Sequence, residues 1–146
     1  MKKTELPNAE AVIRGSKDYP GLRGLVKFYE EQNCVLVEAV IQGLPDNGTG
    51  FFGFHIHEGN SCTGADFADT VGHYNPDKTP HPLHAGDLPP LMSCHSNAFL
   101  AVATSRFKIS DIIGKTVVLH SMADDLHTQP SGNAGTKIAC GMIRRV

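Results

Sequence analysis

Five of the eight histidines in this chain lie between Gly53 and Asp87, in the blocks GFHIHE, GHYNP and HPLHAGD. A sixth, His120, ends the apolar run IIGKTVVLH farther along the chain. Imidazole nitrogens with one carboxylate suit zinc and copper, whereas calcium and magnesium prefer oxygen ligands. The sequence therefore predicts a metal site, for which the fold must bring these separate blocks together.

The block GFHIHE places His55 and His57 two residues apart. On a β-strand, residues at this spacing point to the same face, so both rings can reach one ion while Phe54 and Ile56 pack on the opposite face. An H-x-H pattern alone is weak evidence, because exposed strand histidines also produce it.

The block HPLHAGD carries three more candidate ligands at intervals of three residues, namely His81, His84 and Asp87. Its proline and glycine residues are incompatible with a regular helix, so these side chains converge from a loop. Two histidines and a carboxylate are plausible zinc ligands. His73 lies between the two blocks.

Most of the remaining chain has the pattern of short β-strands. Alternating or β-branched runs bounded by Gly/Pro turns predict strands at 9–15, 22–30, 34–42, 53–58, 98–107, 114–120 and 136–144. Residues 59–97 show little periodicity, which is unusual in a compact domain unless something such as metal ligands pins the segment. We see no convincing helical stripe. The pattern favours an all-β antiparallel sandwich or barrel.

Length and charge set limits on the function. The 146 residues are most simply one domain, and 40% hydrophobic with 19% charged residues is typical of a globular protein. A net charge of −2 gives no electrostatic case for a nucleic-acid partner. No apolar run approaches the roughly 20 residues that would span a membrane.

The N-terminal residues MKKTELPNAEA lack the apolar core of a signal peptide. We therefore expect a cytoplasmic protein, or a periplasmic or secreted one if a leader was removed. The four cysteines, Cys34, Cys62, Cys94 and Cys140, could form up to two bridges or remain thiols, and no pair has C-x-x-C spacing. A cytosolic location would favour thiols.

Six blocks occur in an order that resembles the copper/zinc superoxide dismutase family: GFHIHE, GHYNPDK, HAGDL, IIGKTVVLH, ADDL and GNAGTKIACG. The resemblance covers nearly the entire chain, from about Ala9 to Ile143, and GDLPPL is closer to the bacterial branch. It implies an eight-stranded antiparallel Greek-key β-barrel of the Ig-like sandwich type, with two long functional loops holding the metals outside the barrel.

The resemblance implies superoxide as the substrate, dismutated to dioxygen and hydrogen peroxide by copper that cycles between Cu(II) and Cu(I). The copper ligands would be His55, His57, His73 and His120. The zinc ligands would be His73, His81, His84 and Asp87, with His73 bridging one copper and one zinc per chain and supplying a proton during catalysis. The segment between His81 and His84 is much shorter than in the animal enzymes, so a different local path must deliver His81.

Three further positions match the family. Asp124 corresponds to the carboxylate that orients one copper-ligating and one zinc-ligating histidine, here His55 and His81. Cys62 and Cys140 correspond to the disulfide of the family. Asp124 could also be a plain loop aspartate.

Lys137 stands where most of the family has an arginine that guides and docks superoxide. Lysine keeps the charge but lacks the planar guanidinium fork, so we expect retained but reduced activity. An ordinary exposed strand lysine is the other interpretation. The loop 125–135 carries no Lys or Arg, so electrostatic guidance falls largely to Lys137.

A second function is compatible with the same residues, namely a zinc-stabilised protein that binds or buffers copper with little turnover. A homodimer is left open by the sequence. Cys34 is expected to be an inert buried thiol in a strand, and Cys94 and His95 to be plain loop residues, with an adventitious metal site as the alternative. His127 has no assigned role.

Overall fold

A computed structural model describes residues 6–146, so Lys2 and Lys3, which entered the signal-peptide argument, lie outside the described residues. Within that range the strands are β1 (Ala9–Gly15), β2 (Arg23–Glu30), β3 (Val35–Gln42), β4 (Phe51–Phe52), β5 (Phe54–His57), β6 (Leu91–Met92), β7 (Asn97–Thr104), β8 (Thr116–His120) and β9 (Lys137–Arg145). Two short helical turns accompany them, η1 (Ala65–Thr70) and α1 (Ile109–Ile112).

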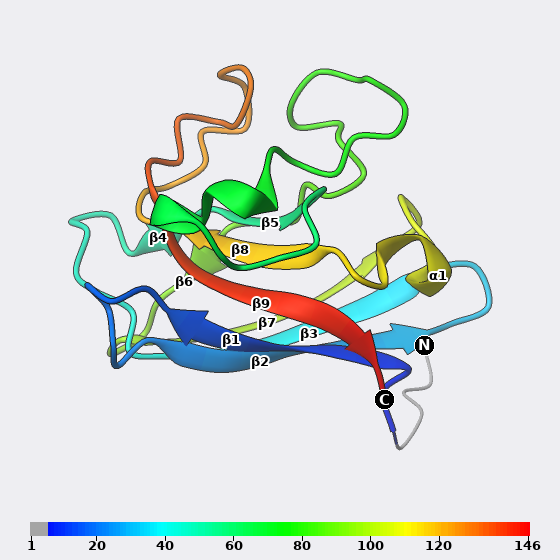
Figure 1. The fold of residues 1–146 in the computed structure, drawn as a ribbon, viewed down its shortest axis with the longest axis horizontal. Coiled ribbons are helices and arrows are strands. Elements are labelled where there is room, and N and C mark those ends of the chain that lie inside the picture. Colours follow the sequence, from blue (N-terminus) through cyan, green and yellow to red (C-terminus); the bar gives the residue numbers. More distant parts are fainter. Residues whose placement is uncertain (1–5) are drawn as a thin grey trace.

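The strands form a curled antiparallel sheet, in the order β5-β8-β9-β1-β2-β3-β7 (Figure 1). The short pair β4-β6 connects its two edges, because only Gly53 separates β4 from β5 and a turn at 93–96 leads from β6 into β7. The expected all-β antiparallel barrel is confirmed. The number of strands differs from the expected eight. In the described residues seven strands share one sheet, and the two-residue strands β4 and β6 form a separate pair.

Alternation along β1, β2 and β3 builds the barrel interior. Ile13, Phe28 and Ile41 are fully buried, while the positions next to them are more exposed, except for Tyr29 beside Phe28, which is also buried. This period of two places one face of each strand on the core and the other toward water.

The strands β5 and β8 differ, because every residue in them is buried. Their inner face packs on the core and their outer face lies beneath the two long loops, which rise on the same side of the barrel (Figure 1). The loop side of β5 and β8 is therefore where polar side chains can be buried together.

Three features differ from the sequence-based expectation. The strands β4 and β6 and the four-residue α1 are too short to produce a periodic pattern. Cys34 is not a buried strand residue, since β3 begins at Val35 and Cys34 is partly exposed in the preceding turn, without a disulfide. The expectation that Cys34 is buried within a strand is therefore wrong.

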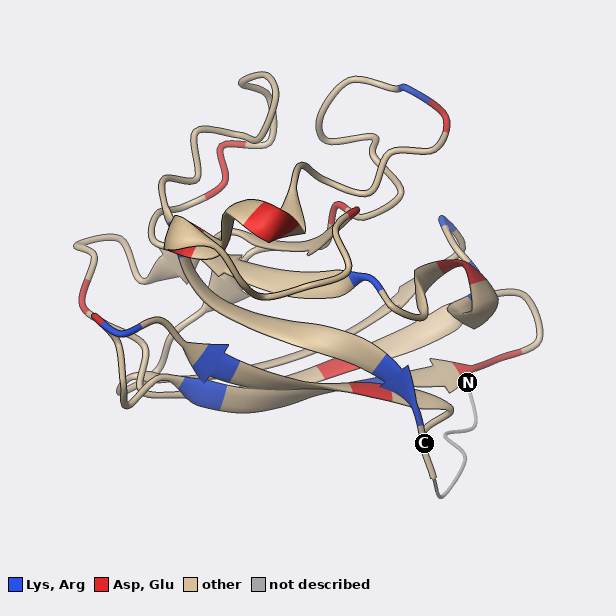
Figure 2. Cartoon of the chain, viewed as in Figure 1, with Lys and Arg blue, Asp and Glu red and all other residues tan. Residues whose placement is uncertain are grey.

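Lys, Arg, Asp and Glu residues are spread over separate strands and loops, as Figure 2 shows. Among the described residues, no helix has the length and apolar character needed to cross a membrane.

Candidate metal centre

The strand β5 supplies the first two histidines. His55 and His57 leave the same face of β5 and are almost completely buried, at 0% and 2% exposure. Phe54 and Ile56 point into the core on the other face, as the spacing predicts.

The loop after β5 folds back onto the same strand at two points. Tyr74 N–H donates to the Ile56 carbonyl at 2.8 Å, and Ile56 N–H donates to the Gly86 carbonyl at 2.8 Å. A Cβ at Gly86 would lie 2.2 Å from the Ile56 carbonyl oxygen, so only glycine permits this approach. His73 precedes Tyr74 and Asp87 follows Gly86, so these contacts place both candidate ligands beside β5.

Two groups of possible ligand atoms result, with the atoms of each group within 4.8 Å of one another. His73 belongs to both. The first group is His55, His57, His73 and His120, and the second is His73, His81, His84 and Asp87. The structure thus brings together every residue that the sequence analysis assigned to the two metal sites.

The distances within the groups suit ligands around an ion. His57 Nε2 lies 3.2 Å from His120 Nε2, and His73 Nδ1 lies 3.2 Å from His84 Nδ1 and 2.7 Å from Asp87 Oδ1. Ligand atoms about 2.0 Å from a tetrahedral ion are about 3.3 Å apart.

Buried ring nitrogens in this cluster lack a hydrogen-bond partner, among them His55 Nδ1 and His73 Nε2, whereas His81 Nδ1 lies 3.0 Å from Asp87 Oδ2. Unpaired buried polar atoms are costly, and a metal ion would satisfy their lone pairs. Nitrogen-only and nitrogen-with-carboxylate donor sets suit copper and zinc respectively. The residues present therefore fit both metals.

Asp124 fixes two of the rings from the loop between β8 and β9. His55 Nε2–H donates to Oδ2 at 2.7 Å and His81 Nε2–H donates to Oδ1 at 2.8 Å. Because a carboxylate only accepts, both histidines carry the proton on Nε2 and keep Nδ1 available as a ligand. A Cβ at Gly132, where φ is +74°, would collide with Asp124, so the loop approaches the carboxylate closely.

Burial keeps His55, His57 and His120 neutral. It lowers the pKa of His55 to about 4 and that of His120 to about 3, with nearby imidazoles adding to the effect at both positions, and the pKa of His57 is also well below its usual value. Burial would raise the pKa of Asp87, yet its hydrogen bond with His73 and the neighbouring histidines give a net lowering. At neutral pH His55, His57 and His120 are thus in the neutral state that binds metals.

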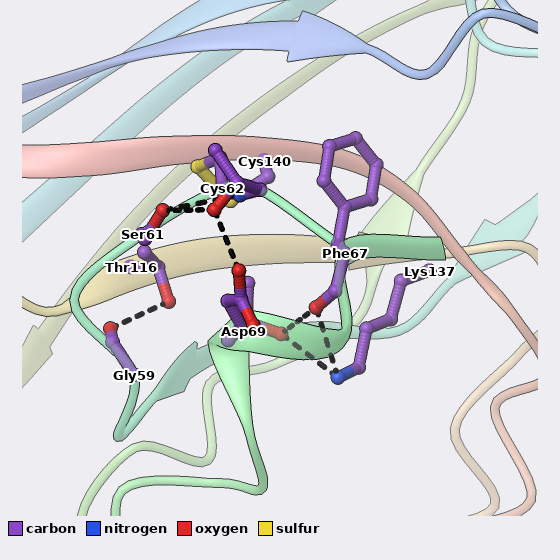
Figure 3. Close-up of a disulfide and its surroundings, with 10 residues drawn as sticks. Gly59, Ser61, Cys62, Phe67, Asp69, Thr116, Lys137 and Cys140 are labelled. Carbon is purple, nitrogen blue, oxygen red and sulfur yellow. Dashed lines mark hydrogen bonds between the residues drawn. A yellow bond between two sulfur atoms is a disulfide. The ribbon is translucent and has the colours of Figure 1, made fainter. Parts of the chain in front are cut away.

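Lys137 lies at the rim of a cavity of about 530 Å³ that opens onto His57, His73 and His120. Its Nζ donates to Thr70 Oγ1 at 2.8 Å and to the Val71 carbonyl at 2.9 Å, so the lysine holds the end of η1. A longer contact of 3.5 Å joins Nζ to the Phe67 carbonyl in the same turn (Figure 3).

The Val71 carbonyl also accepts from His57 Nδ1 at 3.0 Å. Val71 has φ +60°, which is uncommon for a β-branched residue, and this conformation directs its carbonyl toward both donors. Neither Thr70 nor Val71 was predicted to take part, and no sequence signal marks them.

The disulfide Cys62–Cys140 is confirmed and ties the segment before η1 to β9 (Figure 3). Cys94 is an exposed free thiol in the turn before β7, beside His95. None of the ligand groups found in the described residues contains Cys94, His95 or His127.

Two side chains that sequence reasoning missed contact the turn that carries His81, His84 and Asp87. Arg106 donates to carbonyls at 82, 84 and 87, and Gln129 pairs with the backbone of His81.

Comparisons with known proteins agree with this geometry. A family model described as copper/zinc superoxide dismutase matches residues 22–143. The Cu-Zn superoxide dismutase 2 of Aquifex aeolicus is 34% identical over 139 residues, covering 83% of this chain and 78% of the relative. The Cu-Zn superoxide dismutase 4 of Dictyostelium discoideum is 33% identical over 160 residues, covering 94% and 98%. The copper chaperone for superoxide dismutase of Rattus norvegicus is 28% identical over 159 residues, covering 99% of this chain and 57% of the relative.

Proposed function

The chain belongs to the copper/zinc superoxide dismutase family, and we propose that it converts superoxide to dioxygen and hydrogen peroxide at the two adjoining ligand groups. The observation that carries the proposal is the position of His73, whose side chain is shared by both groups. A single imidazole in that position can join a redox-active ion to a structural one.

In this proposal one copper per chain is held by His55, His57, His73 and His120, and one zinc by His73, His81, His84 and Asp87. Copper, when bound, would supply alternating one-electron oxidation and reduction, whereas zinc has no redox chemistry.

The chain itself would supply the proton. His73 Nδ1 faces His84 and Asp87, while its Nε2 is buried without a hydrogen-bond partner, facing the first group. A proton taken up at Nε2 would be delivered beside the reacting oxygen, since His73 lines the cavity.

Lys137 would attract and orient the superoxide anion. Among the described residues that line the cavity, Lys137 is the one Lys or Arg side chain. Asp66 contributes a carboxylate to the same lining. Lys137 Nζ also donates to Thr70 Oγ1, to the Val71 carbonyl and, at 3.5 Å, to the Phe67 carbonyl, so its three donors would have to be shared between η1 and the substrate.

The test is to load the purified chain with copper and zinc, quantify both, and follow superoxide consumption by stopped flow. We expect one copper and one zinc per chain and catalytic consumption, with His73→Gln abolishing catalysis. The exposed His127→Gln is the matched control and should behave as wild type. Fully metallated protein without catalysis would contradict the proposal.

A second function, copper binding or delivery, is favoured by the similarity to a copper chaperone, of which the matched region spans just over half. The same preparation discriminates, because a delivery protein would bind one copper per chain, leave superoxide untouched and pass copper to a metal-free acceptor.

A further inference from the structure

The segment that carries His81, His84 and Asp87 is a short turn. Three hydrogen bonds lie within it: Leu83 N–H donates to the Pro80 carbonyl at 2.8 Å, Asp87 N–H donates to the His84 carbonyl at 3.1 Å, and His84 N–H donates to Asp87 Oδ2 at 3.0 Å. We propose that Arg106 and Gln129 are positioning residues that hold this turn in the shape needed to bind zinc. This inference rests on the proposed function, because it assigns the second ligand group to zinc.

Arg106 donates hydrogen bonds to the outer side of the turn. It follows β7, and its Nη1 donates to the Pro82 carbonyl at 2.7 Å and to the His84 carbonyl at 3.2 Å, with the Asp87 carbonyl at 3.4 Å. Three carbonyl oxygens that point at one place repel one another unless a cation lies between them. All three contacts are made by Nη1, which carries two N–H groups, so the Pro82 and His84 carbonyls accept the shorter bonds and the Asp87 carbonyl lies at the limit of hydrogen-bond distance.

Gln129, in the other long loop, forms hydrogen bonds with the turn. Its Oε1 accepts from His81 N–H at 2.8 Å and its Nε2 donates to the His81 carbonyl at 2.8 Å. This pair of opposed bonds fixes the backbone of His81 as a neighbouring strand would. Since Asp124 orients the ring of the same residue, His81 is held at both its backbone and its side chain.

The location of the turn explains why it needs these contacts. A groove of about 350 Å³ lies between the turn and β7, lined by Pro82, Leu88, Val102 and Arg106 among others. The turn is therefore not packed tightly against the barrel on this side. The long polar side chains of Arg106 and Gln129 reach it instead.

The test uses the full chain and three variants, Arg106→Ala, Arg106→Lys and Gln129→Ala. The matched controls are Arg23→Ala and Gln42→Ala, which lie opposite each other on β2 and β3, outside both long loops. Zinc affinity is measured with Zn²⁺ in competition with a chromophoric chelator. Tetrahedral coordination is followed by the visible absorption of Co²⁺, and the copper ligands by the EPR spectrum of Cu²⁺.

Outer contacts of metal ligands typically change metal affinity by 10- to 100-fold. We therefore expect Arg106→Ala and Gln129→Ala to weaken zinc binding by about 10- to 100-fold and to alter the Co²⁺ spectrum. Arg106→Lys should fall between Arg106→Ala and wild type. Copper affinity and the Cu²⁺ spectrum should stay unchanged, as should both controls.

Zinc affinity within twofold of wild type in both alanine variants would overturn the inference. A parallel loss of zinc and copper affinity would also overturn it, because it would indicate general destabilisation; the melting temperature of the metal-free protein checks this. If Arg106→Ala does not fold, Arg106→Lys and Gln129→Ala decide. A wild-type chain that binds no zinc would overturn the proposed zinc site itself, whereas equal binding by wild type and variants would overturn this inference alone.

Discussion

The barrel strands and the two long loops are ordered by different forces. In β1, β2 and β3, alternate side chains such as Ile13, Phe28 and Ile41 are fully buried in a continuous apolar core. The loops above β5 and β8 bury polar side chains instead, and are held by a few hydrogen bonds, the disulfide and the converging ligands. Removing metal or changing pH should therefore disturb the loops, while the barrel should respond to lost apolar volume.

The largest expected effect is on the barrel side. Phe28→Ala removes a fully buried ring and should lower the free energy of unfolding by about 3–5 kcal/mol. Because Phe28 lies away from the ligands, urea titrations should show the same loss in metal-free and metal-loaded protein. Exposed Phe99→Ala is the control and should change little. A loss of stability confined to the metal-loaded form would contradict the view that the barrel core is independent of the metal ligands.

Acid should act on the loop side. The pKa values of His55 and His120 are lowered to about 4 and about 3 in the folded chain, against about 6.5 when unfolded. Above pH 6.5 both states are neutral at these groups, so they do not affect stability. Below it the unfolded chain binds protons that the folded chain excludes, so stability falls from pH 6.5 toward pH 3–4.

Each of these two histidines lowers the free energy of unfolding by up to about 1.4 kcal/mol per pH unit. The free energy of unfolding of the metal-free protein should therefore fall by roughly 2 kcal/mol or more between pH 7 and pH 5. Urea titrations at several pH values in chelator measure this loss. His120→Gln should flatten the slope and His127→Gln should not. A pH-independent stability over this range would contradict the assignment.

Asp124→Asn should affect the loops and leave the barrel unchanged. The amide cannot accept from both His55 and His81 through two carboxylate oxygens, so the orientation of one ring is lost. We expect zinc and copper affinity to fall about 10- to 100-fold, with little change in the stability of the barrel. Chelator competition measures the affinities, and Asp125→Asn is the neighbouring control. Unchanged affinity for both metals would show that the hydrogen bonds of Asp124 do not orient the ligands.

The sequence predicted the barrel strands well, because alternation in segments such as Ala9–Gly15 directly records which side chains face the core. Candidate ligands were also visible, since histidine at fixed spacing is chemically distinctive. The contacts of Arg106, Gln129 and Val71 were not predictable, because they join segments distant in sequence through backbone carbonyls that any residue can supply. Cys34 was misplaced because an apolar run does not show where a turn ends.

The smallest expected effect concerns Lys137. An arginine could keep the contacts with Thr70 and Val71 and still offer donors to superoxide. One additional hydrogen bond worth about 1 kcal/mol would raise kcat/KM about fivefold. Stopped-flow kinetics of Lys137→Arg at several ionic strengths test this, with Lys115→Arg as the control. An unchanged or lower kcat/KM would count against a docking role.

The most direct test of the shared position of His73 is an EPR spectrum of the chain loaded with two Cu²⁺ ions, one in each ligand group. If the His73 imidazolate joins the two ions, their electron spins couple, and the signal falls well below that of two isolated Cu²⁺ ions. A full signal from two independent Cu²⁺ ions per chain would show that no single imidazole joins the sites, and would contradict the account.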